Sequence, residues 1–441
     1  MKKADRNALN LPELGFKSPV QAQDKPRGWF ARLGPGLITG ASDDDPSGIA
    51  TYSQVGAQFG LGMLWTMLFS YPLMAGIQEI SARIGRVTGH GIAGNMRRHF
   101  SRALLYAVVG LVVIANTINI GADLGAMGAA LQLVIGGSSL LYTACFAVAS
   151  MLLQVFVPYS KYVSVLKWLT AALLAYVVTV FVIRIPWGEV IRSTLLPAIS
   201  FDAAHLTALV AVLGTTISPY LFFWQASQEV EDQEGNPAES ALIKAPEQAA
   251  AQIGRIKLDT YAGMAASNLV AFFIILTAAA TLHVAGKTDV ATAAQAAAAL
   301  QPLAGPFAAL LFTLGIVGTG LLAVPVLAGS AAYGVGEALR WPVGLERKPL
   351  EARGFYAVIA GATLIGLALD FSNIDPIRML FWSAVINGVV AAPVMVVMML
   401  MAQNRKVMGP FVIETRLKVL GWLGTAVMFA AALGLLATWG R

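Results

Sequence analysis

The stretch Gly34–Phe59, GPGLITGASDDDPSGIATYSQVGAQF, is apolar and long enough to cross a bilayer, yet three consecutive aspartates stand in its middle. These aspartates, Asp43–Asp45, are followed closely by Pro46 and Gly48. A carboxylate at membrane depth costs several kcal/mol unless it is paired, protonated or bound to a cation. Because proline has no amide hydrogen and glycine does not restrain the backbone, the pattern predicts an unwound break near the middle of the membrane.

Such a break indicates a cation site. Irregular backbone persists at membrane depth where it is buried in protein or lines a water-filled cavity. Secondary transporters place their cation sites at breaks of this kind. The alternative is that the aspartates lie just outside the membrane and that the helix starts at Ile49. Apolar residues precede the three aspartates as well as follow them, which favours the first interpretation.

The composition is that of a polytopic membrane protein. Of 441 residues, 57% are hydrophobic and 12% are charged, and the mean hydropathy is +0.69. Such a profile is typical of membrane chains and not of soluble domains. The single cysteine, Cys145, excludes a disulfide framework. No HExxH, GxSxG or P-loop pattern is found, so we expect no enzyme activity and no catalytic residues.

Eleven apolar stretches predict eleven membrane helices, most of them long enough for a hydrocarbon core about 30 Å thick. The first residues are polar and basic, without the pattern of a signal peptide, and predict a cytoplasmic tail over residues 1–33. A transport core over 34–401 and a loop with an additional helix over 402–441 complete the expected organisation. The predicted helices lie near 34–59, 62–84, 103–133, 139–157, 162–183, 205–228, 259–283, 303–337, 354–370, 376–401 and 417–438.

The distribution of Lys and Arg predicts the orientation. With the N-terminus inside, the tail and the even-numbered loops carry 25 of the 30 basic residues and the opposite side carries five. This bias predicts a cytoplasmic N-terminus and a C-terminus outside, in a plasma (bacterial inner) membrane. The net charge of +6 is explained by a basic rim that faces anionic lipid, so no nucleic-acid partner is expected.

A second interrupted helix is predicted at 205–228, where Thr215, Thr216 and Ser218 precede Pro219. The proline removes a helical hydrogen bond and frees carbonyl groups before it. Breaks in the first and sixth helices, five helices apart, indicate an inverted repeat of helices 1–5 and 6–10 with the site at the interface of the repeats. The hydroxyl groups then either line that site or act as local caps of a kinked helix.

Other polar residues fall inside apolar stretches. Asn116, Asn119 and Asp123 share one face of the third helix. We interpret the asparagines as packing residues and Asp123 as functional. Glu79 and Asn387 are further candidates for the ion path. The acidic segment that begins at Glu229 is interpreted either as a concentrator of exiting cations or as a solvated loop face.

At these residues the chain resembles the Nramp family of divalent-metal transporters. The resemblance covers essentially all of helices 1–10, and it implies an all-α, LeuT-like fold with two five-helix inverted repeats, unwound helices 1 and 6, and an eleventh helix. It implies that helices 1 and 6 coordinate the metal. The motifs that carry it are GPGLITGASDDDPSGIATYSQVGAQFG, GADLGAMGAA and TTISPYLFFWQ. The implied metal residues are Asp45, Gly48, Thr215 and Ser218, with Asp44, Thr216, Tyr220, Asp123, Asn387 and Glu79 as secondary or pathway residues.

Several positions depart from the usual family motifs. The asparagine of the helix-1 motif Asp-Pro-Gly-Asn is replaced by Gly48. In helix 6 the methionine is replaced by Ser218 and the histidine linked to proton movement by Tyr220. In helix 3 the second carboxylate is replaced by Ala126. These changes resemble the Nramp-related magnesium transporter branch, for which the resemblance implies a wider site for a hydrated ion without obligatory proton coupling.

The sequence therefore predicts transport of hydrated Mg²⁺ by alternating access, with Mn²⁺ tolerated and without tight proton coupling. Hydroxyl, carboxylate and water ligands suit these ions, which are substrates and not cofactors. The first alternative is a proton-coupled Mn²⁺/Fe²⁺ symporter. A sodium-coupled amino-acid transporter fits less well because the aspartates would repel the substrate carboxylate, and a membrane metal sensor would need an output domain. The expected partners are divalent ions and lipid, with no obligate protein partner evident.

Overall fold

The structure is a computed structural model that describes residues 35–157, 170–371 and 374–438. In these ranges the chain forms helices joined by short loops, without a strand. The helices are α1 (Pro35–Asp43), α2 (Pro46–Phe59), α3 (Trp65–Thr88), α4 (Ile92–His99), α5 (Arg102–Ile135), α6 (Ser139–Phe156), α8 (Leu174–Val182), α9 (Trp187–Leu195), α10 (Ala203–Thr216), α11 (Pro219–Glu234), α12 (Ala249–Ala278), α13 (Ala293–Ala297), α14 (Gln301–Ala304), α15 (Ala308–Leu339), α16 (Arg353–Leu369), α17 (Pro376–Ala402), α18 (Arg405–Met408) and α19 (Thr415–Thr438).

Each of the eleven predicted stretches contains a helix, although part of 162–183 lies outside the described residues. By length and composition, seven helices or helix runs in the described chain can cross a membrane, or eight if the pair 46–63 and 65–88, bent by 108°, counts as one. The segments 171–182 and 353–369 are apolar but shorter. The helix predicted to begin near residue 259 begins at Ala249, because the preceding polar turns continue the same helix.

Both predicted breaks are present, and proline begins the second half of each broken helix. α1 ends at Asp43 and α2 begins at Pro46, with Asp45 as its N-cap. α10 ends at Thr216 and α11 begins at Pro219. Proline is well suited to the first position of a helix, where an amide hydrogen would have no intrahelical partner. In both broken helices, proline is therefore the residue that starts the second half.

The half-helices pack closely against continuous helices through glycines. A Cβ added to Gly40 of α1 would lie 2.4 Å from the backbone carbonyl of Gly263 in α12. A Cβ added to Gly214 of α10 would lie 2.4 Å from the backbone nitrogen of Gly388 in α17. Small residues allow such close approach of helices in membranes. α1 and α10 are therefore each seated against a helix that is continuous through the bundle.

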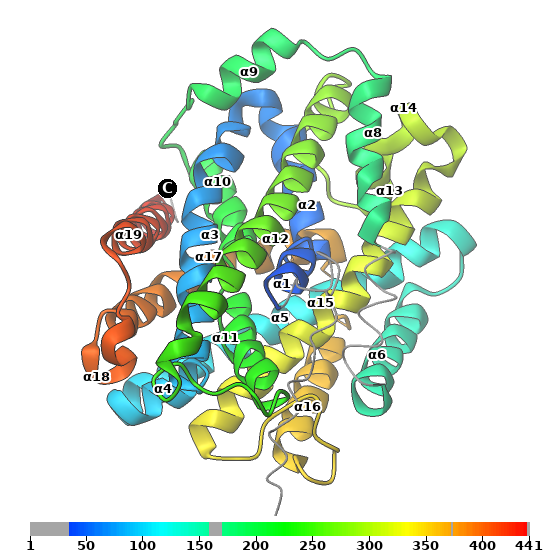
Figure 1. Cartoon of the computed structure of the whole chain (residues 1–441). Coiled ribbons are helices and arrows are strands. Elements are labelled where there is room, and N and C mark those ends of the chain that lie inside the picture. The colour runs from blue at the N-terminus through cyan, green and yellow to red at the C-terminus, as the bar shows by residue number, and fades with distance from the viewer. Residues whose placement is uncertain (1–34, 158–169, 372–373, 439–441) are drawn as a thin grey trace, which may run out of the picture.

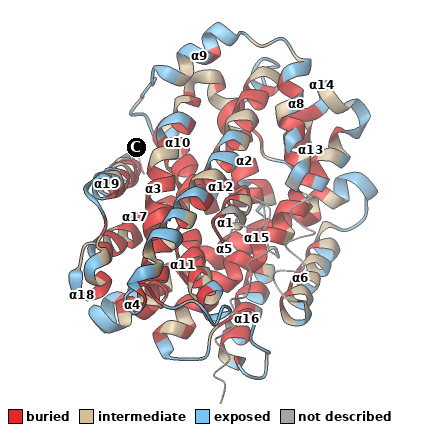
Figure 2. Cartoon of the chain, in the orientation of Figure 1, coloured by how far each residue is buried: buried red, intermediate tan, exposed pale blue. Residues whose placement is uncertain are grey.

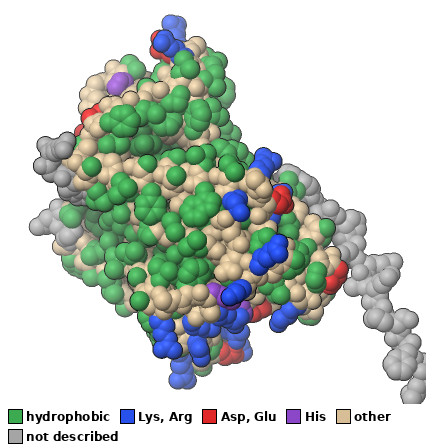
Figure 3. Space-filling view, turned by 90° about the vertical axis from the view of Figure 1, so that its left-hand side faces the viewer, with side chains coloured by type: hydrophobic (Ala, Val, Ile, Leu, Met, Phe, Trp, Pro, Cys, Tyr) green, Lys and Arg blue, Asp and Glu red, His purple; other side chains and the backbone are tan. Residues whose placement is uncertain are grey.

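Figure 1 shows the two ends of the bundle. We call the end with α4, α18 and the loop 340–352 the α4 end, and the end with α9 and the loop 284–292 the α9 end. α2, α5 and α15 lie in the buried centre, whereas α6 and α19 lie at the periphery with many exposed residues (Figures 1 and 2). On the face in Figure 3, apolar side chains form a broad belt, with many Lys and Arg side chains below it. This surface suits a bilayer around the bundle.

Candidate metal site

The carboxylate of Asp45 lies in the first break and is almost fully buried, with 2% of the residue exposed. Its Oδ1 atom accepts a hydrogen bond from the backbone N–H of Gly48 at 2.7 Å. Its Oδ2 atom accepts one from Nδ2 of Asn119 at 3.0 Å, and the Tyr220 hydroxyl lies 3.5 Å away. A carboxylate offers about four lone-pair positions. Both oxygens of Asp45 are thus oriented by protein donors and still have acceptor capacity.

Asn119 is held in turn by α17. The Ser383 hydroxyl lies 2.6 Å from Oδ1 of Asn119 and 2.7 Å from the carbonyl oxygen of Leu380. Asn119 and Ser383 are both buried. With its oxygen engaged by the serine, the amide of Asn119 turns its NH₂ group toward Asp45. The sequence interpretation of Asn119 as a packing residue is therefore incomplete, and Ser383 was not among the predicted residues.

Two oxygen atoms, from α1 and α10, and the ring of Tyr52 lie close to the Cα of Gly48. A Cβ added there would lie 3.1 Å from Oγ1 of Thr215, 3.3 Å from Cε2 of Tyr52 and 3.5 Å from the carbonyl oxygen of Asp43. The hydroxyls of Thr215 and Tyr52 interact with one another, and neither bonds to another group in the described chain. The absence of a side chain at Gly48 thus allows the hydroxyl of Thr215 and the carbonyl of Asp43 to lie close to its backbone. Tyr52 is a further residue that the sequence did not single out.

The other hydroxyls of the second break bind the backbone. Ser218 donates to the carbonyl oxygens of Gly214 and Thr215, which lie at 2.7 and 2.9 Å. Thr216 donates to the carbonyl of Val212 at 2.9 Å. This is the capping role that the sequence left open for both residues. Because both hydroxyl protons are used, only the oxygen lone pairs could bind a ligand. The assignment of Ser218 to the metal site and of Thr216 to the secondary or pathway residues stays a prediction.

Asp43 and Asp44 share a single donor. Oγ of Ser267 in α12 lies 2.6 Å from Oδ2 of Asp43 and 3.0 Å from Oδ1 of Asp44. A serine hydroxyl has one proton to donate. Both carboxylates are buried, and none of the ion pairs in the described chain includes them. The break therefore brings together the carboxyl groups of three aspartates in a place where they are almost fully buried.

Three predicted residues remain. Asp123 and Asn387 lie on the helices that contact the break, whereas Glu79 forms an ion pair elsewhere. Asp123 is fully buried one helical turn beyond Asn119, and its oxygens have no hydrogen bond in the described chain. Asn387, one turn beyond Ser383, is equally buried and its amide has no described partner. Glu79 lies apart from this group. Its Oε1 atom is 2.6 Å from Nη2 of Arg83, and it makes none of the contacts of Asp45.

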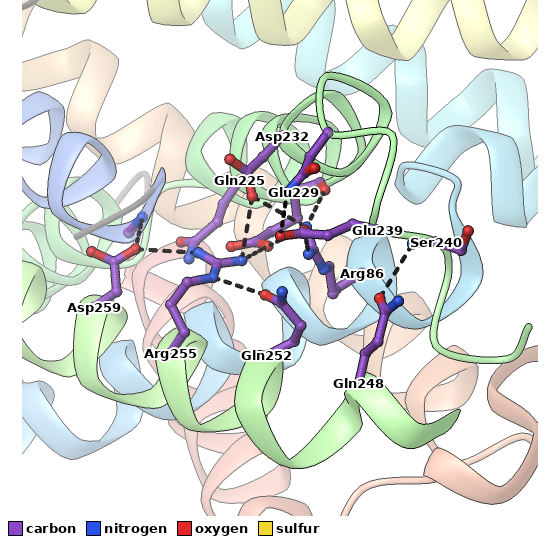
Figure 4. Close-up of polar contacts among 12 residues, drawn as sticks. Arg86, Gln225, Glu229, Asp232, Glu239, Ser240, Gln248, Gln252, Arg255 and Asp259 are labelled. Atoms are coloured by element: carbon purple, nitrogen blue, oxygen red, sulfur yellow. Dashed lines mark hydrogen bonds and ion pairs between the residues drawn. The ribbon is translucent and has the colours of Figure 1, made fainter. Parts of the chain in front are cut away.

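Ion pairs at the α4 end join α3, α11 and α12 (Figure 4). Nη2 of Arg255 lies 2.5 Å from Oε2 of Glu229, and Nη1 of Arg86 lies 4.0 Å from the same atom. Arg86 also pairs with Asp232 and Glu239. We call these residues, together with Asp259, the Arg86–Arg255 network. The acidic segment that begins at Glu229, expected to follow the sixth helix, instead forms the last turns of α11 as far as Glu234. Glu229 and Asp232 are engaged in ion pairs there, a role that neither sequence interpretation gave them.

The network continues to the start of α1. Oδ2 of Asp259 accepts a hydrogen bond from the backbone N–H of Gly36 at 2.7 Å and lies 3.9 Å from Nη1 of Arg255. At the same end, α11 is also joined to α15, because Glu231 accepts a hydrogen bond from the hydroxyl of Tyr333 at 2.7 Å. The first half-helix is thereby connected through side chains to three other helices at this end.

Carboxylate, amide, hydroxyl and carbonyl groups thus meet between two broken helices. No group of three His, Cys, Asp or Glu side chains that could hold a metal ion is found in the described ranges. Two broken helices, five helices apart, with buried carboxylates at the break are the arrangement of the LeuT-like fold. The family model described as Natural resistance-associated macrophage protein-like, Nramp, matches residues 36–438. The chain belongs to the Nramp family, whose members are transporters and not enzymes.

Solved structures show the same fold at low sequence identity. A mutant of the Eremococcus coleocola manganese transporter is 16% identical, with 94% of this chain and 88% of that chain covered and a TM-score of 0.74. The same transporter in complex with an aromatic bis-isothiourea substituted compound gives a TM-score of 0.71, with 16% identity and coverages of 94% and 89%. The MhsT structure with L-phenylalanine is 13% identical, with coverages of 92% and 97% and a TM-score of 0.60.

Proposed function

We propose that this chain moves hydrated Mg²⁺, and Mn²⁺ with lower preference, across the membrane by alternating access and without tight proton coupling. The observation that carries the proposal is the burial of three carboxyl groups, Asp43–Asp45, at the break, with no ion-pair partner in the described chain. Burying an uncompensated carboxylate is costly, so such a cluster favours a bound cation. A manganese transporter with the same fold supports a divalent ion as that cation.

The groups at the break favour an ion that keeps its water. Asp45 already accepts hydrogen bonds at both oxygens, and the hydroxyls of Thr215 and Tyr52 have no hydrogen bond to another group in the described chain. Mg²⁺ loses water reluctantly and is usually held by one or two carboxylates with several waters in place. Oxygen donors suit Mg²⁺ and Mn²⁺, whereas a thioether would favour softer metals. Asp45 would then bind the ion through water or with a single oxygen.

The arrangement of α11 supports the absence of tight proton coupling. Tyr220 stands where the family has a histidine, and its hydroxyl lies 3.0 Å from the carbonyl oxygen of Ser42. A tyrosine hydroxyl titrates near pH 10 in water, so it transfers protons poorly at neutral pH. The alternative, a proton-coupled Mn²⁺/Fe²⁺ symporter, is favoured by one observation, namely the buried Asp123 without a described partner.

Uptake into liposomes that contain a trapped pH dye distinguishes these two functions. We expect Mg²⁺ and Mn²⁺ to enter down their electrochemical gradient under an inside-negative potential, without acidification in proportion to the metal. Ca²⁺ and Fe²⁺ uptake measured in parallel gives the selectivity. Acidification that follows metal entry and is lost in Asp123→Asn would establish the symporter instead.

Alternating access requires each end of the bundle to close in turn, and the Arg86–Arg255 network closes the α4 end. It joins α1 to α3, α11 and α12 through buried or half-buried ion pairs. The bias of basic residues would place this end in the cytoplasm. Release of the ion on that side would require α1 to separate from Asp259. We therefore assign the network the role of an inner gate in the proposed cycle.

Asn119→Ala is expected to weaken metal binding, because the Asp45 carboxylate loses the nearer of its two donors at Oδ2. A hydrogen bond to a charged group contributes about 1.5–3 kcal/mol, so we expect about a tenfold or larger rise in the half-saturating Mg²⁺ concentration. Concentration-dependent uptake measures it. Asn116→Ala is the matched control, since Asn116 on the same helix bonds to Leu327 and Ser330 instead. Equal half-saturation in Asn119→Ala and wild type would contradict the assigned role of Asn119.

A further inference from the structure

A cavity of about 210 Å³ lies between α2 and α17 at the α9 end. Ala50, Gln54 and Gln58 of α2 line one wall, and their spacing of four residues places them on one helix face. Ala50 is two residues beyond Gly48. Arg378 of α17 and Asp289 of the loop 284–292 also line it. The cavity therefore lies on the side of α2 that leads from the α9 end toward the break.

The loop above the cavity is fixed to α2. Oε1 of Gln54 accepts from the backbone N–H of Val290 at 2.7 Å, and its Nε2 donates to the carbonyl of Thr288 at 3.3 Å. These two bonds flank Asp289. Nε2 of Gln54 also donates to Oε1 of Gln58 at 3.1 Å. The carboxylate of Asp289 is thus placed beside a wall of amide side chains.

The carboxylate of Asp289 forms an ion pair with the guanidinium group of Arg378. Its Oδ2 atom lies 3.2 Å from Nη2 of Arg378, and the two side chains are 70% and 59% exposed. An ion pair exposed to this extent contributes little to stability, so a competing cation can open it. Arg378 is also among the few basic residues on the side of the chain that we expect to face outward.

We propose that this cavity is an outer site that holds a hydrated divalent cation on Asp289, with Gln54 and Gln58 bonded to its waters, and that Arg378 is a tethered cation which the metal displaces. This inference rests on the proposed function. Water fills about 30 Å³ per molecule in the liquid, so the cavity has room for about seven waters, enough for an ion with six. The attraction of a cation to Asp289 scales with its charge. A divalent ion therefore gains by replacing Arg378, whereas a monovalent ion does not.

Kinetics of uptake at low metal concentration test the outer site. Asp289→Asn is expected to raise KM about three- to fivefold with an unchanged maximal rate, a range that corresponds to an exposed charge interaction. Arg378→Gln is expected to lower KM and to make uptake sensitive to Na⁺ at constant ionic strength. The double variant should match Asp289→Asn, because Arg378 acts through that carboxylate. Glu189→Gln and Arg192→Gln, exposed on α9 at the same end, are controls for the changes of charge and should leave KM unchanged.

A binding measurement separates failure of this inference from failure of the proposed function. Mn²⁺ binding to the purified protein, followed by electron paramagnetic resonance, is expected to leave one weak site in Asp45→Ala and none in Asp45→Ala with Asp289→Asn. If Asp45→Ala keeps the weak site but the wild-type protein takes up no metal, the outer site is supported and the proposed transport function is contradicted. An unchanged KM in Asp289→Asn, or equal binding by the single and double variants, would overturn the outer site alone.

Discussion

Proteoliposomes that contain the Asp45→Ala variant are expected to take up no more Mg²⁺ or Mn²⁺ than empty liposomes. Asp45 is the carboxylate on which Gly48, Asn119 and Tyr220 converge. Two unit charges 4 Å apart attract by about 4 kcal/mol at an effective dielectric constant of about 20, and a divalent ion doubles this value. We therefore expect a loss of at least about 100-fold in uptake. Isotope or fluorescent-indicator assays measure it.

The variant should still fold, since the substitution removes one N-cap and also removes a buried negative charge. Loss of an N-cap costs about 1 kcal/mol. Asp202→Ala is the matched control, because Asp202 caps α10 in the same way but is exposed and distant from the break. It should lose a similar amount of stability and keep its uptake. Normal uptake by Asp45→Ala, with insertion equal to wild type, would exclude the break as the site.

Glu229→Gln is expected to open the α4 end. The change keeps the shape of the side chain but removes the charge that Arg86 and Arg255 share. Loss of one partner from a buried ion network costs about 3–5 kcal/mol, although Arg255 is partly exposed and the cost falls accordingly. The variant should populate states in which α1 has separated from Asp259. Its metal uptake should fall because the cycle no longer closes this end firmly.

The accessibility of Thr260, replaced by cysteine, measures this opening. Thr260 is buried beside Gly36, and the exposed Cys145 is first replaced by alanine. We expect about tenfold faster labelling by a membrane-impermeant thiol reagent from the α4 side in Glu229→Gln, equivalent to about 1.4 kcal/mol of the network's contribution. Glu234→Gln, exposed at the end of the same helix, is the matched control. Equal labelling rates in both variants would show that the network is not a gate.

The helix breaks were predictable because their causes are local. Pro46 and Pro219 cannot continue the helices before them, and the residues around them need no distant partner to act. The same reasoning placed three aspartates at the first break, where Asp45 is the N-cap of α2. It also located the apolar stretches, because hydropathy over about 20 residues is a property of the segment itself.

The contacts that complete the site depend on the tertiary packing. Asn119 is 74 positions from Asp45, and Ser383 is 264 positions from Asn119, so no local pattern connects them. In the sequence, nothing distinguishes Tyr52 from other aromatic residues in apolar helices. From the sequence alone, the acidic residues at the end of α11 could be exposed to solvent, whereas in the structure Arg86 and Arg255 reach them from other helices. The spacing of Asn119 and Asp123 on one face was the one sequence signal that pointed toward this side of the site.

Anomalous diffraction from crystals soaked in Mn²⁺ tests the central claim most directly. The account predicts one strong peak at the break between α1 and α2, close to the Asp45 carboxylate and beside Gly48 and Thr215. The peak should weaken when Mg²⁺ is added in excess and be absent in Asp45→Ala. A principal peak elsewhere in the bundle, or a peak at the break that persists in Asp45→Ala, would contradict the assignment of this site.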